Sequence, residues 1–299
     1  MMPLLMPMLA TSAEPFDSDA HLFEIKWDGV RALAAVEDSQ WRLWGRQGAD
    51  YHDRYPELAV LNRLPSGTIV DGELVVLRDG RADLTALLRR HQLRHADKIH
   101  HAGQQASVSY LLFDILGHRG RTLVQESLER RRAVLAEVLS AVSDSRLLLS
   151  EGVVGAGREL FERAVAAGQE GVMAKHLDGR YRPGRRSSSW QKIKPKRIVP
   201  VVIVGYTPTR EGLHSLLVAA VCDGALRYVA ELTHGFRAAD KSDLARRLRT
   251  RQRSVPVVAC PHQAVWVEPE LYCRVQCLSW TSGGRLRDAV FRGLFDNDG

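Results

Sequence analysis

Apolar and polar residues alternate over short stretches of the first two thirds of the chain, as expected for strands with one buried face. Turn-forming residues separate these stretches, and the pair Asp79-Gly80 is typical of a hairpin turn. Other stretches have helical spacing, with Asp83 and Ser127 as expected first residues and Gly168 as a stop signal. The pattern predicts strands over 22–36, 41–45, 68–77, 108–116, 172–175 and 190–194, and helices over 56–64, 83–90, 127–139 and 157–167.

The pattern changes near residues 195–200, after which the chain reads strand, strand, strand, helix, strand, strand. A helix between the third and fourth of five strands matches the layout of an oligonucleotide-binding (OB) β-barrel. We therefore expect an α+β domain over residues 1–197 and a small OB-fold domain over residues 198–299. The expected strands are 201–206, 215–222, 226–232, 264–267 and 271–279, and the expected helix is 241–252.

The composition narrows the class of partner. The chain has 42 Lys and Arg residues against 35 Asp and Glu residues, a formal charge of +7. An excess of cations favours a polyanion such as nucleic acid, because phosphate neutralisation releases counterions. Basic proteins that bind no nucleic acid are also common, so charge alone leaves both interpretations open.

The first ten residues are apolar but lack the features of a secretory signal. Pro3 and Pro7 interrupt them, and no Lys or Arg precedes the apolar run. No stretch of the sequence approaches the ~20 apolar residues that a membrane helix needs. We therefore expect a cytoplasmic protein without a membrane span.

The cysteines raise the question of a structural zinc site. Cys260, His262, Cys273 and Cys277 lack the paired Cys-x-x-Cys spacing that such sites commonly have. Cys273 and Cys277 also lie in a stretch that is predicted to be a strand. Reduced, buried thiols are the expected state.

Charged residues two positions apart recur in the strand-like stretches of the first domain. Because side chains alternate along a strand, such residues lie on the same face. Any one set alone is explained by the solvent-facing side of an amphipathic strand. Several sets in one domain, each surrounded by apolar residues and glycines, favour a shared polar cleft. The sets are Glu24, Lys26 and Asp28; Asp71 and Glu73; Lys192 and Lys194; and Glu170 just ahead of the strand at 172–175.

The residue types in this cleft indicate phosphate chemistry. Clustered Lys and Arg side chains suit a triphosphate, and carboxylates such as Glu73 and Glu170 suit Mg²⁺, which prefers oxygen ligands. The sequence contains no Gly-x-x-x-x-Gly-Lys-Ser/Thr P-loop and no kinase motifs. A phosphate-handling enzyme that lacks a P-loop but has a lysine among charged residues indicates covalent catalysis through that lysine.

The segment Lys26-Trp-Asp-Gly-Val-Arg31 resembles the Lys-x-Asp-Gly-x-Arg signature of the covalent nucleotidyltransferases, which include DNA ligases, RNA ligases and mRNA capping enzymes. Companion segments follow in the family's order, and on this basis the chain resembles an ATP-dependent DNA ligase. The companions are Gly45-Arg46-Gln-Gly48, Asp71-Gly-Glu73, the strand at 110–116, Glu170-Gly-Val-Met-Ala-Lys175 and Trp190-Gln-Lys-Ile-Lys194.

The resemblance implies an ATP-grasp-like nucleotidyltransferase (adenylation) domain ahead of the OB fold. Lys26 would attack the α-phosphate of ATP and pass AMP to the 5′-phosphate at a nick, where the 3′-hydroxyl would displace it. Lys192 and Lys194 would complete the catalytic set by holding the α-phosphate. Glu170 and Glu73 would hold Mg²⁺ or Mn²⁺.

The resemblance also assigns the rest of the ATP site. Phe113 would stack on the adenine, and Glu24 would position the base through its backbone. Arg46 and Glu73 would hold the ribose or a neighbouring DNA phosphate. Arg31 would bind the 5′-phosphate of the nick, so it counts as both an ATP-site and a DNA-binding candidate.

The segment 181–189 is rich in arginine and serine. Arg182, Arg185 and Arg186 in this segment are candidate contacts to the DNA backbone, since arginine commonly binds phosphate. An ordinary solvated loop explains the same composition nearly as well.

Two segments resemble the ligase module of bacterial ligase D-type end-joining enzymes in particular: residues 7–10 and the tail at 286–294. The tail departs from the family, because Ala289 replaces the usual proline and 295–299 replaces a basic-x-acidic-lysine ending. That ending normally helps to orient pyrophosphate. Arg287 or Arg292 is the candidate substitute.

The resemblance implies nicked duplex DNA as substrate, repair or end-joining proteins as partners, a monomeric state, and a bacterial, nucleoid-associated location. Two alternatives remain. An RNA ligase or capping-type nucleotidyltransferase would share the motifs, and GTP preference would mark the latter. A catalytically impaired DNA-binding relative is favoured only by the altered tail. A NAD⁺-dependent ligase does not fit, because its four-cysteine zinc site and N-terminal nucleotide-recognition segment are not seen in the sequence.

Overall fold

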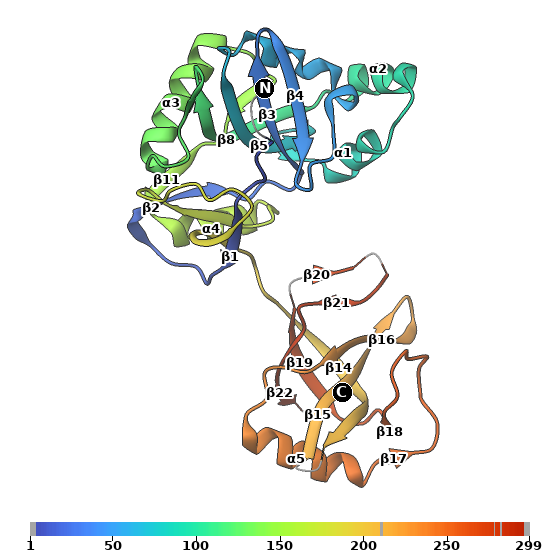
Figure 1. Ribbon diagram of the computed structural model, residues 1–299. Coiled ribbons are helices and arrows are strands. Elements are labelled where there is room, and N and C mark those ends of the chain that lie inside the picture. Colours follow the sequence, from blue (N-terminus) through green and yellow to red (C-terminus); the bar gives the residue numbers. More distant parts are fainter. Residues whose placement is uncertain (1–3, 210–211, 278, 282, 296–299) are drawn as a thin grey trace. The chain divides into compact units, whose positions relative to one another are not determined.

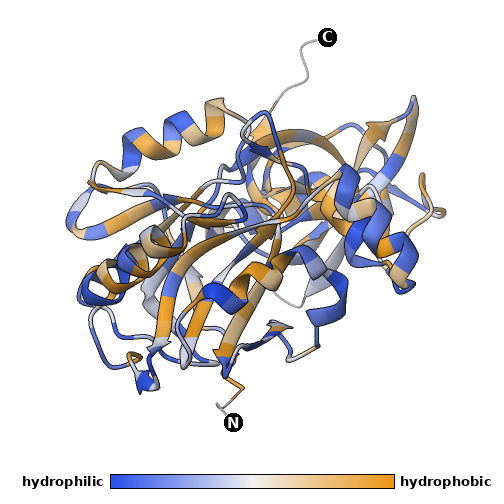
Figure 2. Cartoon of the chain, turned by 90° about the horizontal axis from the view of Figure 1, so that it is seen from above, coloured by the Kyte–Doolittle hydropathy of each residue, from blue (hydrophilic) through white to orange (hydrophobic). Residues whose placement is uncertain are grey.

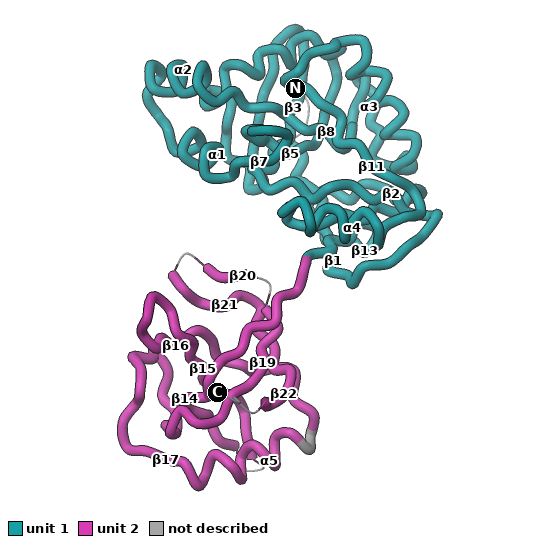
Figure 3. Tube along the Cα trace, turned by 180° about the vertical axis from the view of Figure 1, so that it is seen from behind, with its two compact units in different colours: residues 1–194 teal, residues 195–299 magenta. Residues whose placement is uncertain are grey.

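The computed structural model describes residues 4–209, 212–277, 279–281 and 283–295. The chain divides into two compact units, residues 1–194 and residues 195–299 (Figure 3). The sequence placed this division between residues 197 and 198. Each unit has its own hydrophobic core, and each is therefore described by itself.

The first unit is built on two sheets (Figure 1). The first sheet has the strand order β1-β13-β12-β2-β11, and the second has the order β10-β8-β5-β3-β4. The strands of the first sheet are β1 (Leu9–Ser12), β2 (Ser18–Ile25), β11 (Gly152–Gly155), β12 (Val172–His176) and β13 (Arg186–Ile193). Those of the second are β3 (Val30–Glu37), β4 (Gln40–Gly45), β5 (Thr68–Val75), β8 (Ser109–His118) and β10 (Leu147–Leu149), with β9 (Arg121–Thr122) beside β8.

The apolar residues of strand β3 are buried on both faces, because the second sheet lies between two hydrophobic cores. Ala32 and Ala34 belong to the core on one face, whereas Leu33 and Ala35 belong to the core on the other face. A strand that is buried on both faces reads as a continuous apolar run, as this one does. In Figure 2, which colours hydrophobic residues orange and hydrophilic residues blue, much of the strand surface is orange, whereas the helices alternate between orange and blue.

Helices cover the outer face of the second sheet, where α3 (Leu128–Val142) packs on β8. The Ser127 hydroxyl accepts a hydrogen bond from the Arg130 backbone amide at 3.2 Å, and Asp83 caps α1 in the same way at 2.8 Å from Ala86. Both predicted N-caps are therefore confirmed. The other helical segments are α1 (Leu84–His91), α2 (Ala96–Gln105), α4 (Gly157–Ala166), and the 3₁₀ segments η1 (His52–Arg54) and η2 (Pro56–Arg63).

Several local predictions were wrong in detail. The single strand expected over 22–36 is two strands, because the chain leaves the first sheet after Ile25 and enters the second at Val30. The helix expected at 56–64 is a 3₁₀ helix, and α2 was not predicted. The loop expected at 181–189 is partly strand, since β13 begins at Arg186. The predicted Asp79-Gly80 hairpin turn joins β6 (Leu77–Arg78) to β7 (Arg81–Ala82).

The second unit is a sheet with the order β16-β15-β14-β18-β17, in which β19 joins β14 to β22 (Figure 1). The five predicted strands and the helix after the third strand are present, whereas β17, β20, β21 and β22 were not predicted. Closure of this sheet into a barrel stays a prediction. The elements are β14 (Arg197–Thr209), β15 (Gly212–Cys222), β16 (Ala225–Leu232), α5 (Ala238–Arg249), β17 (Gln252–Arg253), β18 (Val265–Val267), β19 (Tyr272–Cys277), β20 (Ser279–Trp280), β21 (Leu286–Arg287) and β22 (Val290–Phe295).

The tail that the sequence singled out contributes a strand to this unit. β22 pairs antiparallel with β19, with Phe291 opposite Val275. Phe291 is 2% exposed and packs in the core of the unit. The altered ending falls largely on residues 296–299, which lie outside the described residues.

The cysteines occupy apolar surroundings. Cys273 and Cys277 belong to the core of the second unit, and burial raises the pKa of the Cys273 thiol to about 12. Cys260 packs against a neighbouring apolar cluster. Among the described residues, no helix is long and apolar enough to cross a membrane.

A buried ion pair ties α3 to the second sheet. Arg131 and Asp114 are both 0% exposed and are joined by two hydrogen bonds, of 2.7 and 2.9 Å. Arg131 also donates to the carbonyl oxygens of Glu126 and Gly179, at 2.7 and 2.9 Å. The arginine thus joins the helix, the sheet and the segment ahead of β13.

Replacing Arg131 with alanine is expected to lower the free energy of unfolding by roughly 3–5 kcal/mol, because Asp114 would remain charged and buried without its partner. Urea denaturation would measure the change. The matched control is Arg163→Ala on α4, whose side chain is 75% exposed and whose loss should change stability by less than about 1 kcal/mol. Equal effects of the two substitutions would contradict this account.

Candidate active site

A cavity of about 330 Å³ lies in the first unit and is lined by residues from both sheets. The sequence patterns therefore converge in space, although the strands that carry them are far apart in the chain. Lys26 lies in the loop after β2 rather than on the strand, so the shared strand face expected for Glu24, Lys26 and Asp28 was wrong. The residues predicted for the nucleotide site all line the cavity: Glu24, Lys26, Arg31, Arg46, Glu73, Phe113, Lys192 and Lys194.

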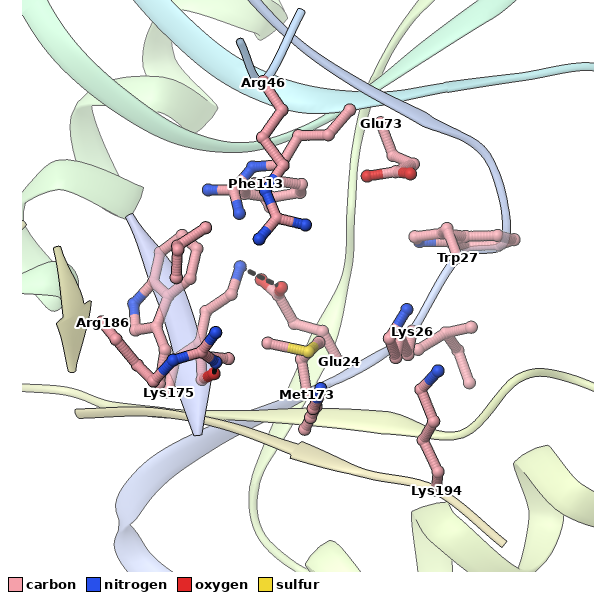
Figure 4. A pocket seen from close by; sticks show the side chains of 16 residues that line it. Glu24, Lys26, Trp27, Arg46, Glu73, Phe113, Met173, Lys175, Arg186 and Lys194 are labelled. Carbon is pink, nitrogen blue, oxygen red and sulfur yellow. Dashed lines mark hydrogen bonds and ion pairs between the residues drawn. The ribbon is translucent and has the colours of Figure 1, made fainter. Parts of the chain in front are cut away.

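Two lysines line one end of the cavity and meet at the carboxylate of Glu170, which is not itself among the lining residues. The ammonium groups of Lys26 and Lys194 both contact the carboxylate of Glu170, and Figure 4 shows the two lysine side chains ending next to each other. Burial alone would raise the pKa of the Glu170 carboxyl, but Lys26 and Lys194 hold it below its usual value. Burial raises the pKa of Asp28, with Glu170 adding to the effect.

The backbone brings this cluster together. Lys26 follows the last residue of β2, and its amide donates a hydrogen bond of 2.9 Å to the carbonyl oxygen of Gly171. Gly171 has φ +140°, and a Cβ at this position would lie 2.1 Å from the carbonyl oxygen of Ile193. Only glycine allows this approach. The Glu-Gly sequence therefore places Glu170 beside the end of β13, where Lys194 begins its side chain.

The other end of the cavity is formed by a buried ion pair under aromatic rings. Glu24 and Lys175 are each 1% exposed and contact one another, as Figure 4 shows. Arg132 from α3 lies 3.1 Å from the second carboxylate oxygen of Glu24. The Lys175 ammonium lies 4.1 Å from the ring centroid of Phe113 and 4.5 Å from that of Trp190. Burial lowers the pKa of Lys175, and Glu24 opposes the shift.

Arg31 lines the cavity and is held by several partners. It forms two hydrogen bonds to Asp71, of 3.0 and 2.6 Å. Its guanidinium carbon lies 5.3 Å from the Phe113 ring centroid and 5.2 Å from that of Trp190. Burial would lower the pKa of Arg31, but Asp71 raises it, so the cation is permanent.

Glu73 and Arg46 lie at the wall that the second sheet provides. Burial raises the pKa of the Glu73 carboxyl to about 8, although Arg31 opposes the shift. Arg46 is exposed and stands after β4. Gly45 replaces the serine of the family pattern, and the structure gives the reason: a Cβ at this position would lie 2.1 Å from the hydroxyl oxygen of Tyr51.

The donor set fits Mg²⁺ and ATP. Mg²⁺ is commonly bound by one or two carboxylates together with phosphate oxygens rather than by an all-protein cage. Among the described residues no group of three or more His, Cys, Asp or Glu side chains forms such a cage. Glu73 and Glu170 can supply the carboxylates, the lysine cluster suits phosphates, and the aromatic end suits a base.

Sequence reasoning missed part of this cavity. Met173, Lys175, Trp27 and Trp190 also line it. The signal for Lys175 and Met173 was present, because both lie on a predicted strand two residues apart, on one face. Arg132 carried no such signal, since it reaches the site from a helix whose spacing showed only an amphipathic pattern.

The candidate DNA-binding arginines differ from one another in their surroundings. Arg182 and Arg185 are exposed. Arg186, at the start of β13, lines the cavity and donates a hydrogen bond to the carbonyl oxygen of Ala10. Arg31 is largely buried, with 19% of its side chain exposed.

Family models agree with this geometry. Residues 7–194 match the model described as "ATP dependent DNA ligase domain", and residues 209–297 match "ATP dependent DNA ligase C terminal region". The chain belongs to the ATP-dependent DNA ligase family. The first match contains the whole cavity, and the second covers most of the second unit.

One curated relative is a bacterial end-joining protein. The chain is 34% identical over 303 residues to the multifunctional non-homologous end joining protein LigD of Pseudomonas aeruginosa, covering 96% of this chain and 35% of that protein. The chain thus spans about a third of the length of this relative.

Solved ligase structures match over nearly the whole chain. The ligase domain of Mycobacterium tuberculosis LigD is 30% identical, with a TM-score of 0.58, covering 98% of this chain and 96% of that one. A mycobacterial DNA ligase D complexed with ATP is also 30% identical, with a TM-score of 0.56, 98% of this chain and 96% of that chain being covered. The expected fold, a nucleotidyltransferase domain followed by a C-terminal domain, is confirmed.

Proposed function

We propose that this chain is an ATP-dependent DNA ligase that attaches AMP to Lys26 and uses the adenylate to seal nicks in duplex DNA. The observation that carries the proposal is the arrangement of the cavity. The Lys26 and Lys194 ammonium groups meet at Glu170, while Phe113 lines the same cavity. A nucleotide with its base at Phe113 would extend its phosphates toward the two lysines.

The reaction begins with the neutral amine of Lys26. Its nitrogen attacks the α-phosphorus of ATP, a P–N bond forms, and the bond to pyrophosphate breaks. Lys192 and Lys194 stabilise the negative charge that develops on the α-phosphate oxygens. Glu73 and Glu170 would hold Mg²⁺, which would neutralise phosphate charge during the transfer. Arg46, at the cavity wall, contacts the ribose or a neighbouring phosphate.

The next two steps move AMP onto DNA and off again. An oxygen of the 5′-phosphate at the nick attacks the adenylate phosphorus, and the P–N bond to Lys26 breaks. The 3′-hydroxyl then attacks the 5′-phosphorus and expels AMP, which seals the strand. Arg31, the permanent cation in the cavity, binds the 5′-phosphate. Arg182, Arg185 and Arg186 contact the DNA backbone.

The base-binding end gives a prediction that separates affinity from chemistry. In Phe113→Ala, the KM for ATP is expected to rise roughly 10- to 100-fold, because stacking of a base on an aromatic ring contributes about 1–3 kcal/mol. The rate of self-adenylation at saturating ATP should change much less. Phe113→Tyr keeps the ring and should remain within about threefold of the parent. An unchanged KM in the alanine variant would show that the adenine binds elsewhere.

The biological setting follows from the relatives. LigD proteins are named for non-homologous end joining, and we place this chain in DNA repair or end joining in the bacterial cytoplasm, on nucleoid DNA. Repair or end-joining proteins would be its partners, and it would act as a monomer. Arg287 on β21 and Arg292 on β22 remain the candidates to replace the altered C-terminal ending.

The proposal is tested by sealing a labelled nicked duplex in the presence of Mg²⁺. Sealed product with ATP, but not with GTP or NAD⁺, is expected. Activity with GTP would favour a capping-type enzyme, and sealing restricted to RNA would favour an RNA ligase. A chain that binds the nick but never seals it would be the impaired relative.

A further inference from the structure

The guanidinium of Arg31 is part of a closed ring of hydrogen bonds formed by four residues. Arg31 donates to both carboxylate oxygens of Asp71, at 3.0 and 2.6 Å, and to the carbonyl oxygen of Met8 at 2.8 Å. The hydroxyl of Tyr181 donates to Asp71 at 2.6 Å and accepts from the amide of Met8 at 2.9 Å. Each of the four residues thus contacts two others of the ring.

The ring joins segments that are far apart in the sequence. Arg31 lies on β3 and Asp71 on β5, whereas Met8 precedes β1 and Tyr181 precedes β13. Met8 and Asp71 are 0% exposed and Tyr181 is 1% exposed. Tyr181 therefore lies in the core, although its segment, 181–189, was predicted to be a loop. A ring of this kind is rigid because each buried polar group would lose a partner if one member moved.

Tyr181 has no direct access to the phosphate-binding end of the cavity. It is absent from the residues that line the cavity in the described part of the chain. Its ring packs edge-on against Trp190 at 5.7 Å, and burial raises the pKa of its hydroxyl well above the usual value. The hydroxyl therefore stays protonated and remains a donor to Asp71. Any influence on the reaction must pass through its neighbours.

We propose that Tyr181 is a positioning residue that fixes the guanidinium of Arg31 for the 5′-phosphate of the nick, acting through Asp71 and the Met8 backbone. This inference rests on the proposed function, in which Arg31 binds that phosphate. Two bonds to Asp71 set the plane of the guanidinium, and the Met8 carbonyl fixes its third side. The Tyr181 hydroxyl bonds to the Asp71 carboxylate and to the Met8 amide, and so holds both residues that accept from Arg31 in place.

The substitution Tyr181→Phe removes the hydroxyl and keeps the ring. Two rates are measured: AMP transfer from ATP to the protein, and sealing of a 5′-phosphate nick by protein that is already adenylated, in a single turnover. The first rate should stay within about threefold of the parent. The second should fall roughly 10-fold or more, because a nick phosphate would meet a misplaced Arg31.

The matched control is Tyr55→Phe. Tyr55 is also 0% exposed, and its hydroxyl makes a 2.7 Å hydrogen bond to His91. This substitution should lower the melting temperature to a similar extent while leaving the ratio of the two rates unchanged. A purely structural role for Tyr181 would reduce the active fraction and would affect both steps equally, as would general destabilisation.

A double-mutant cycle with Arg31→Ala tests whether Tyr181 acts through Arg31. Once Arg31 is absent, Tyr181→Phe should have almost no further effect on the sealing rate. Three results would overturn the proposal. The two substitutions could reduce the sealing rate by independent factors that multiply in the double variant. Tyr181→Phe could slow self-adenylation and sealing equally, or it could seal at the parent rate.

The melting temperatures of the parent, Tyr181→Phe, Arg31→Ala and the double variant test the hydrogen-bonded ring without any need for ligation activity. The losses in melting temperature should be clearly less than additive, because the first substitution already opens the ring. Additive losses would contradict the ring even in a protein that seals. Absence of sealing by the parent, together with non-additive melting temperatures, would contradict the proposed function and leave the ring supported.

Discussion

Replacing Lys26 with alanine is expected to reduce AMP transfer to the protein below detection, a loss of roughly 10⁴-fold or more, as for other enzymes that lose a nucleophile. In the proposed reaction, the side-chain nitrogen of Lys26 is the protein atom that forms the covalent bond to AMP. Its side chain is 21% exposed, and its ammonium contacts Glu170 at the lysine cluster of the cavity. The measurement is the amount of label from α-labelled ATP that stays on the denatured protein.

Lys26→Arg is the sharper companion variant. It keeps a positive charge beside Glu170, but a guanidinium is always protonated in proteins and has no free electron pair to attack phosphorus. Attack on phosphorus requires a nitrogen with a free electron pair, which the neutral amine of a lysine has. Both variants should fold like the parent and fail alike. Labelling of either one would assign the nucleophile to another residue.

Replacing Lys194 with alanine is expected to lower the self-adenylation rate at saturating ATP by roughly 10²- to 10³-fold, the usual cost of removing a group that stabilises transition-state charge. Lys194 reaches Glu170 from the end of β13. In the variant, the α-phosphate would lose a cation. The Glu170 carboxylate would keep its contact with Lys26 and would compete with the phosphate for that lysine.

Two further variants show whether charge is the cause. Lys194→Arg should recover part of the rate, because it restores a cation at the same place. Lys98→Ala, which removes an exposed lysine from α2, should leave the rate unchanged. Self-adenylation of Lys194→Ala within about threefold of the parent would remove Lys194 from the catalytic set.

The sequence predicted which residues share the cavity better than how the backbone places them. Spacing alone indicated that carboxylates and lysines share a cleft, and the cavity does bring Lys26, Glu73 and Lys194 together. The reason was wrong for Lys26, which lies in the loop after β2. Period-two spacing gives the same pattern whether the strand continues or turns between two sheets, so the sequence could not distinguish the cases.

Local sequence patterns could not predict which residues contact the predicted site residues. Arg132 contacts Glu24 at 3.1 Å from a helix more than a hundred residues later in the chain, and Tyr181 joins Asp71 across a similar separation. Such pairs depend on how the helix and the segment ahead of β13 pack on the sheets. The spacing of residues along a single sequence contains no information about this packing. Strand β22 was missed because its short apolar run was interpreted as a tail.

The central claim is that Lys26 carries AMP on its way from ATP to a DNA end. The most direct test is to label the purified protein with α-labelled ATP and Mg²⁺, locate the label by peptide mapping, and then add nicked duplex DNA without further ATP. This account predicts label on the peptide that contains Lys26, followed by its discharge and the appearance of a sealed strand. Label on another residue, or label on Lys26 that nicked DNA never discharges, would contradict it.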